Sequence, residues 1–107
     1  MTQVFVNILE NAARYNDKEK PTCNVRSEKI DDSVVISFSD NGMGVSEKHL
    51  SKIFDSFYQV DMGSGRKVGG TGLGLSICRG IMAAHGGKIW AEQNPKGGTV
   101  FKISLSL

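Results

Sequence analysis

The sequence Gly69-Gly70-Thr71-Gly72-Leu73-Gly74-Leu75 leads from a segment without hydrophobic periodicity into an amphipathic helix. Backbone N–H groups at a helix N-terminus, together with the helix dipole, attract anions. No Gly-Lys-Ser/Thr follows the run, so it is not a Walker loop, and no strand precedes it, as a dinucleotide fingerprint requires. The run therefore predicts a phosphate-sized anion site where a loop enters a helix.

The rest of the chain alternates between helical and extended patterns. Apolar residues at helical spacing or at every second position predict helices and strands, respectively. The expected helices cover 2–15, 46–54 and 72–85, and the expected strands cover 22–30, 33–40, 88–93 and 99–107. This order favours the α+β class: an α/β sandwich with a mixed, mainly antiparallel sheet and helices on one face.

Three local details refine these elements. Ser46 is expected to cap the short helix through its side chain. In the helix over 72–85, one apolar stripe is expected to contain Leu73, Ile77, Ile81 and Ala84. Gly86-Gly87 is a natural C-terminal stop for that helix.

Composition limits what kind of protein this is. With 107 residues, 39% of them hydrophobic and 22% charged, the chain is expected to form one small globular domain. A net charge of +2, with both signs spread throughout, argues against a nucleic-acid surface or a polybasic membrane tether. No apolar stretch approaches the roughly 20 residues of a membrane span. We therefore expect a cytoplasmic domain without membrane contact, in which Cys23 and Cys78 stay reduced.

The first helix carries Asn7, Asn11 and Arg14 at i, i+4 and i+7, so these side chains share one face. Asn is a poor helix former, because its side chain competes for backbone hydrogen bonds. Amide oxygens suit Mg²⁺, which is usually shared with substrate phosphates. A polar helix face without a ligand explains the same spacing, and the spacing alone does not decide between the two.

The strand over 33–40 ends in Asp40-Asn41-Gly42-Met43-Gly44. A carboxylate there could accept a hydrogen bond from the exocyclic amine of adenine, and Gly42 and Gly44 would let the backbone approach the base. A turn without a ligand is the commoner cause of this pattern. Further along, residues 55–71 show no period and predict a long loop.

Together, the three motifs and their order resemble the ATP-binding catalytic domain of sensor histidine kinases. That domain belongs to the Bergerat-fold ATPases, with gyrase, heat-shock chaperones and mismatch-repair ATPases. The resemblance covers nearly all of residues 1–107, and residues 85–92 also resemble KdpD-type sensor kinases. It implies an ATP lid at about 55–71 and a domain trimmed at its N-terminus, where an absent strand would leave a sheet edge open.

The resemblance also implies individual roles. Asn11 and Asn7 would hold Mg²⁺, Asp40 would recognise adenine, and the glycine run would contact phosphate. Ile53–Gln59 resembles the box where the lid begins, but Gln59 replaces the usual Arg, a contact that Arg66 and Lys67 could supply. The full set of expected nucleotide ligands is Asn7, Asn11, Arg14, Tyr15, Asp40, Gly42, Gly44, Arg66, Lys67, Gly70, Thr71, Gly72, Leu73, Gly74, Leu75 and Thr99.

One position discriminates between relatives. Asn7 stands where gyrase-type ATPases have a water-activating Glu, and a neutral amide has no useful basicity at pH 7. The resemblance therefore implies a kinase domain that presents the γ-phosphate of Mg-ATP to a histidine on a separate dimerisation domain, with a response regulator as partner of the full-length protein. Neither His49 nor His85 has the context of that phosphoacceptor, so the isolated chain is expected to be inactive. Two alternatives stay open: a nucleotide-binding module without phosphotransfer, which Gln59 favours, and an ATPase or serine kinase of the same superfamily.

Overall fold

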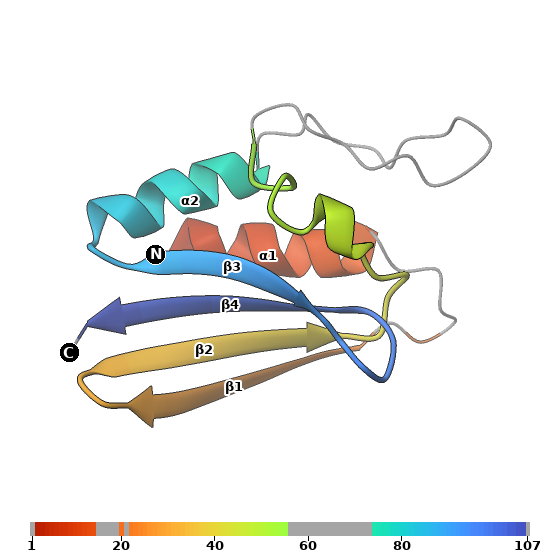
Figure 1. Cartoon of the computed structure of the whole chain (residues 1–107), viewed down its shortest axis with the longest axis horizontal. Coiled ribbons are helices and arrows are strands. Elements are labelled where there is room, and N and C mark those ends of the chain that lie inside the picture. Colours follow the sequence, from red (N-terminus) through yellow and green to blue (C-terminus); the bar gives the residue numbers. More distant parts are fainter. Residues whose placement is uncertain (1, 15–19, 21, 56–73, 107) are drawn as a thin grey trace.

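The computed structural model describes residues 2–14, 20, 22–55 and 74–106. In this part of the chain, two α-helices cover one face of a four-stranded sheet (Figure 1). The elements are α1 (Thr2–Arg14), β1 (Cys23–Ile30), β2 (Ser33–Asp40), the 3₁₀ helix η1 (Glu47–His49), α2 (Gly74–Ala84), β3 (Lys88–Gln93) and β4 (Thr99–Ser106). None of the described helices is long and apolar enough to span a membrane.

The strand order in the sheet is β1-β2-β4-β3, and every ladder among the described strands is antiparallel. The expected α+β fold with helices on one face is confirmed, although the sequence had allowed a mixed sheet. β1 and β2 form an antiparallel hairpin. Its turn places Asp31 at a φ of 53°, a conformation that Asp tolerates better than most residues.

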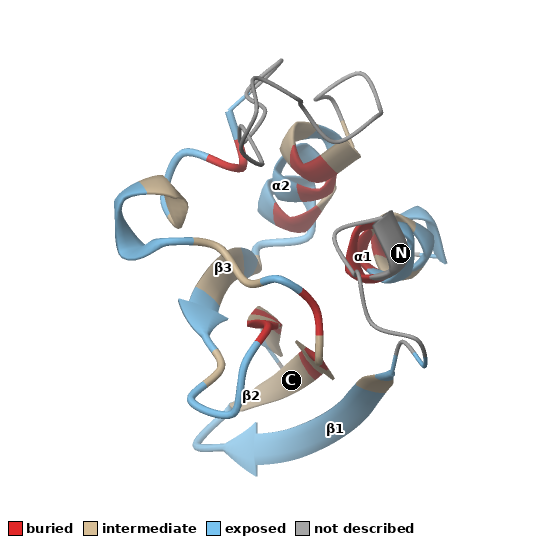
Figure 2. Ribbon diagram, turned by 90° about the vertical axis from the view of Figure 1, so that its right-hand side faces the viewer, coloured by how far each residue is buried: buried red, intermediate tan, exposed pale blue. Residues whose placement is uncertain are grey.

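The core lies between the helices and the sheet (Figure 2). Residues directly opposite each other in a ladder share a face, so Phe38 on β2 and Phe101 on β4 both point toward the helices. Phe5 of α1 packs edge-on against Phe38 with ring centroids 5.3 Å apart, and Phe54 meets Phe101 in the same way at 6.3 Å. The buried hydrophobic residues are Val4, Ile8, Ala12, Phe38, Ile53, Phe54, Leu75, Cys78, Met82, Phe101 and Ile103.

The buried face of α2 differs from the predicted stripe. Leu75, Cys78 and Met82 are buried, whereas Ile77 is 41% exposed and Ala84 is exposed. Of the predicted stripe, Ile81 is half-buried against the core, and Leu73 lies outside the described residues. Apolar residues occur around most of this helix, so its periodicity did not define one face. Packing of α2 against α1 and β3 decides which side is buried, and this result corrects the sequence-based expectation.

The segment after β2 is also more irregular than predicted. Instead of an α-helix over 46–54, only the 3₁₀ helix Glu47–His49 forms, followed by turns, and the Ser46 side chain makes no capping hydrogen bond. Most backbone hydrogen bonds here join residue i to residue i−3, as from His49 to Ser46 and from Lys52 to His49, which is the 3₁₀ pattern. Ile53 and Phe54, at the end of this segment, are buried in the core.

The predicted stop of α2 is confirmed. Gly86 adopts a φ of 70°, its N–H donates to the Ala83 carbonyl at 3.0 Å, and the Gly87 N–H donates to the Met82 carbonyl at 2.8 Å. This pair of hydrogen bonds is a Schellman motif. A Cβ at Gly87 would overlap the Ser104 carbonyl oxygen, so glycine also lets the chain pass closely over β4 on its way into β3.

Candidate nucleotide site

The elements that carry the predicted motifs converge at one end of the molecule. In Figure 1, the C-terminal ends of α1 and β2 and the first residues of α2 and β4 all lie toward the same side. The side chains at this end form two groups. One surrounds Asp40 at the end of the sheet, and the other joins α1 to the beginning of α2.

Asp40 is the last residue of β2, and it is 6% exposed. Its Oδ1 accepts a hydrogen bond from the Gly42 N–H at 2.9 Å and another from the Thr99 N–H at 3.1 Å. Thr99 is the first residue of β4 and is also buried. Antiparallel pairing of β2 with β4 thus brings together two residues that are distant in the sequence but were both predicted to bind the nucleotide.

The electrostatics of this group follow from its burial. Desolvation raises the pKa of the Asp40 carboxyl, and the hydrogen bonds from Gly42 and Thr99 oppose that increase only in part. Cys23 lies directly opposite Asp40 in the β1–β2 ladder. Burial raises the pKa of the Cys23 thiol, and the Asp40 charge adds to the increase, so this cysteine stays protonated. Both hydrogen bonds to the Asp40 carboxylate from Gly42 and Thr99 use Oδ1, which leaves acceptor capacity on Oδ2 for a ligand.

Glycines let three backbone segments meet beside Asp40. Gly98 has a φ of 93°, and a Cβ there would overlap the Asp40 carbonyl oxygen. Gly44 has a φ of 79°, and its Cβ would lie 3.3 Å from the Gly98 carbonyl oxygen. Gly44 is therefore close to the β3–β4 connection, and the approach of its backbone to the base stays a prediction. Gly42 contributes its N–H to the Asp40 carboxylate.

Two asparagines outside the predicted ligand set support this region. The Asn41 side chain accepts from the Thr22 N–H at 2.9 Å and donates to the Lys20 carbonyl at 3.1 Å, so it fixes the entry to β1. The Asn94 side chain donates to the Asp40 carbonyl at 3.2 Å. Asn beside Gly or Pro indicates a turn, because its side chain bonds to nearby backbone. That signal was present at both positions, but it does not reveal the distant partner.

The second group joins the polar face of α1 to the end of the glycine run. Asn7 Nδ2 donates to the Gly74 carbonyl at 3.3 Å, and Asn11 Nδ2 donates to the Asn7 carbonyl at 3.1 Å. Asn11 is only 8% exposed, so this is not an ordinary solvated helix face. A Cβ at Gly74 would lie 3.9 Å from both Asn7 Cγ and Asn11 Nδ2. The Asn-bearing face of α1 and the glycine run are therefore in contact.

The donor set is compatible with Mg²⁺. Both amide nitrogens are directed at backbone carbonyls, which leaves the Asn7 and Asn11 amide oxygens as the groups for a hard cation. Among the described residues, no cluster of three or more His, Cys, Asp or Glu could hold a metal by itself. Such a site would depend on oxygens from the nucleotide phosphates to complete the coordination.

The remaining predicted ligands divide into two sets. Gly74 is the first residue of α2, while Leu75 is buried in the core, and Arg14 is the last residue of α1 with a side chain outside the described part. The other predictions lie outside the described residues, namely Tyr15, Gln59, Arg66, Lys67, Gly70, Thr71, Gly72, Leu73 and nearly all of the lid at 55–71.

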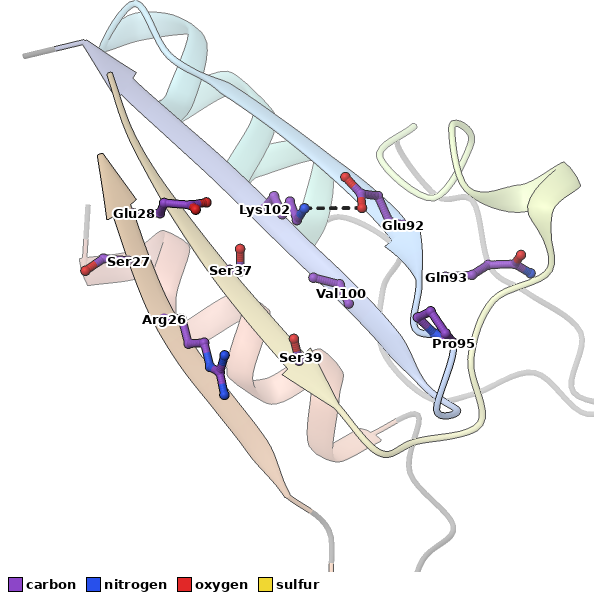
Figure 3. Close-up of a pocket in the computed structure, with 10 residues that line it drawn as sticks. All are labelled: Arg26, Ser27, Glu28, Ser37, Ser39, Glu92, Gln93, Pro95, Val100 and Lys102. Atoms are coloured by element: carbon purple, nitrogen blue, oxygen red, sulfur yellow. Dashed lines mark ion pairs between the residues drawn. The ribbon is translucent and has the colours of Figure 1, made fainter. Parts of the chain in front are cut away.

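The opposite face of the sheet has a different character. A hollow of about 580 Å³ lies there, lined mainly by polar side chains from all four strands, together with Pro95 and Val100 (Figure 3). Lys102 Nζ lies 3.2 Å from Glu92 Oε1, and Trp90 Nε1 donates to Glu92 Oε2 at 2.8 Å. The Trp90 hydrogen bond, followed by the Lys102 charge, lowers the pKa of Glu92. None of the predicted nucleotide ligands lines this hollow.

The sequence profile of the histidine kinase-, DNA gyrase B-, and HSP90-like ATPase family matches residues 1–107. The chain belongs to this family. ATP is thus the nucleotide of this ATPase-family domain, as the sequence motifs had predicted. The similarity of residues 85–92 to KdpD-type kinases stays a prediction.

Individual relatives place the ATPase-family domain among sensor kinases. Sensor protein kinase WalK of Staphylococcus haemolyticus is 43% identical over 106 residues, which are 98% of this chain and 17% of that protein. The chain thus spans only a small part of the curated relatives. The mycobacterial sensor histidine kinase MprB superposes with a TM-score of 0.85 at 28% identity, over 97% of this chain and 70% of that one. Histidine kinase ThkA, in complex with the response regulator TrrA, gives 0.74 at 32% identity, over 97% and 27%.

The raised pKa of Asp40 predicts how stability depends on pH. A carboxyl whose pKa is raised in the fold gives stability that is present below its ordinary value of 3.8 and is lost as pH rises through the raised value. Asp40→Asn removes this loss, since the amide oxygen still accepts from Gly42 and Thr99. Urea unfolding at a series of pH values should therefore show the wild type losing stability relative to the variant as pH rises.

Glu92→Gln is the control for that experiment. Because the pKa of Glu92 is lowered, its contribution is lost as pH falls, so the difference from wild type should have the opposite slope. Equal pH dependence of the wild type and Asp40→Asn would contradict the assigned electrostatics of the buried carboxyl.

Proposed function

We propose that this domain is the catalytic part of a sensor histidine kinase, which binds Mg-ATP and presents the γ-phosphate to a histidine on a separate dimerisation domain. The hydrogen bond from Asn7 to Gly74, with Asn11 one turn away on the same helix face, carries this proposal. It joins an amide-bearing helix face to the end of the phosphate-sized glycine run. No carboxylate occupies the helix position of Asn7, so the site would protect ATP for transfer rather than hydrolyse it.

At the base end of the site, Asp40 supplies selectivity. Its carboxylate accepts a hydrogen bond from the exocyclic amine of adenine, whereas guanine presents a carbonyl oxygen at the corresponding position. Two acceptors facing each other in a buried site lose their hydration without gaining a hydrogen bond. The Thr99 hydroxyl reaches the same edge of the base, directly or through water.

At the phosphate end, the chain stabilises negative charge. The backbone of Gly70–Gly74 and the N-terminus of α2 face the phosphates. Arg14 and Tyr15 help to place the triphosphate, and Arg66 and Lys67 add positive charge that compensates for Gln59. Asn11, supported by Asn7, holds Mg²⁺, which when bound neutralises phosphate charge. Phosphoryl transfer then depends mainly on positioning and electrostatics, which suits a domain without a basic catalytic residue.

The partners follow from the same proposal. The phosphoacceptor is a histidine on the dimerisation domain of the same kinase, and a response regulator is the partner of the full-length protein. The complex of ThkA with TrrA supports the second partner by similarity. We further propose that the domain works in the cytoplasm as part of a membrane-bound sensor, as the likeness to much longer sensor kinases suggests.

The base-recognition role of Asp40 predicts a selective loss of ATP affinity. The wild type should bind ATP in preference to GTP. Asp40→Asn should weaken ATP binding by about 1.5–3 kcal/mol, the range for a hydrogen bond to a charged group. Calorimetric titration measures this, with Asp32→Asn, a charge loss at the exposed β1–β2 turn, as the control. Equal affinity of the wild type for ATP and GTP would refute the role of Asp40.

The metal role of Asn11 predicts a loss of Mg²⁺ dependence. Asn11→Ala removes an oxygen ligand, so ATP affinity measured with and without Mg²⁺ should become equal. Glu10→Ala is the matched control, because Glu10 is the exposed neighbour of Asn11 on the same helix. Full Mg²⁺-dependent affinity in Asn11→Ala would contradict the assignment.

The kinase proposal predicts that this chain alone neither labels itself from γ-labelled ATP nor releases phosphate at an appreciable rate. Adding the cognate phosphoacceptor hairpin as a separate polypeptide should give transfer in trans, slowed because the covalent tether and its effective concentration are absent. Label that persists on the isolated His49→Ala/His85→Ala variant would show a different acceptor. Rapid phosphate release would indicate an ATPase, and ATP binding without transfer to the hairpin would indicate a binding module.

A further inference from the structure

The connection between β3 and β4, residues 94–98, is organised by Asn94. The backbone N–H of Asn94 donates to the Gly98 carbonyl at 3.1 Å, and its carbonyl accepts from the Gly97 N–H at 2.9 Å. Its side-chain oxygen accepts from the Lys96 N–H at 3.1 Å. These three hydrogen bonds stay within the connection and fix its shape.

The side-chain nitrogen of Asn94 makes its hydrogen bond outside the connection. Its Nδ2 donates to the backbone carbonyl of Asp40 at 3.2 Å. The same carbonyl is the group that a Cβ on Gly98 would overlap. Asn94 therefore ties the turn to the peptide that immediately follows Asp40, at the point where the two backbones are in closest contact.

This location links Asn94 to both donors that hold the Asp40 carboxylate. The Gly42 N–H lies two residues after Asp40, and the Thr99 N–H directly follows the connection that Asn94 organises. The bond from Asn94 to the Asp40 carbonyl joins these two backbone segments. Without it, the Asp40 peptide and the beginning of β4 would lose a shared anchor, and the carboxylate would be free to shift.

We propose that Asn94 is a positioning residue for base recognition, which sets the selectivity of the site by fixing the Asp40 carboxylate through its backbone. The inference rests on the proposed role of Asp40 in binding adenine. Asn94 does not touch the nucleotide in this scheme. Its contribution is that a carboxylate held in place discriminates between adenine and guanine more sharply than one that can move to meet either base.

The chemistry of the amide explains why Asn is suited to this position. Asp would keep the side-chain acceptor for the Lys96 N–H, but it lacks a donor and would direct an oxygen at the Asp40 carbonyl. Ala would lose both groups. Asn94→Asp thus preserves the turn while removing the link to Asp40, which makes it the informative variant.

The test compares ATP and GTP affinities, measured by calorimetry, for wild type, Asn94→Asp and Lys96→Ala. The ratio of the two affinities is the readout, because ATP and GTP carry the same phosphate charge. Asn94→Ala is measured in parallel, because a carboxylate added at position 94 would itself raise the pKa of Asp40. The ratio should fall roughly 3- to 10-fold in Asn94→Asp, the effect of losing one hydrogen bond. It should be unchanged in Lys96→Ala, which keeps the Lys96 N–H in the same turn.

A second measurement follows the two backbone amides that donate to the Asp40 carboxylate. In ¹⁵N-resolved NMR spectra, the Gly42 and Thr99 amide resonances should shift in Asn94→Asp and in Asn94→Ala, and stay in place in Lys96→Ala. If Asn94→Asp unfolds, the ATP/GTP affinity ratio and the Gly42 and Thr99 resonances of Asn94→Ala still test whether Asn94 positions Asp40.

An ATP/GTP ratio that stays at the wild-type value in a folded Asn94 variant would overturn the role of Asn94 and leave the role of Asp40 intact. A wild type that binds both nucleotides equally would overturn both proposals.

Discussion

Two backbone N–H groups, from Gly42 and Thr99, donate hydrogen bonds to the Asp40 carboxylate, and the end of the sheet is arranged around these two bonds. The residues come from the loop after β2 and from the beginning of β4. Their meeting depends on the antiparallel register that places β4 beside β2. Burial opposes the charge, as the raised pKa of Asp40 indicates. A buried carboxylate kept at such a position lowers stability, which is characteristic of binding sites rather than of structural cores.

The close packing next to Asp40 makes that geometry rigid. Gly98 is pressed against the Asp40 carbonyl and Gly44 against Gly98, so no side chain could be accommodated at either contact without displacement of backbone. Asn94 then adds a hydrogen bond where the backbones meet. The close contact with Gly98 and the hydrogen bond from Asn94 both act on the Asp40 carbonyl. Together they restrict movement of the Asp40 backbone and, through it, of the carboxylate.

The two halves of the candidate site are linked through the core. Asn7 bonds to the first residue of α2, while Leu75, Cys78 and Met82 of the same helix pack against α1 and the sheet. Phe38, two residues before Asp40, packs against Phe5 of α1. The Asp40 group and the contact between Asn7 and Gly74 are thus set by the same helix–sheet packing, so their separation is a property of the fold rather than of a single loop.

The sequence by itself determined the order of the elements, the alternation of β2 and β4, the helix stop at Gly86-Gly87 and the identity of the motifs. These features are local: they depend on side-chain periodicity and on backbone conformations that few residues adopt. The match of residues 1–107 to the ATPase family agrees with them.

Tertiary structure decided the rest. Apolar residues nearly surround α2, so only packing could select Leu75, Cys78 and Met82 over Ile77. In place of the helix predicted over 46–54, a 3₁₀ helix and turns carry Ile53 and Phe54 into the core. In the sequence, Asn41 and Asn94 show only the signal of a turn. Their distant partners, Thr22 and Asp40, come close only when the strands pair. A pattern in one dimension cannot encode such contacts, because their energy depends on which segments the fold has already brought together.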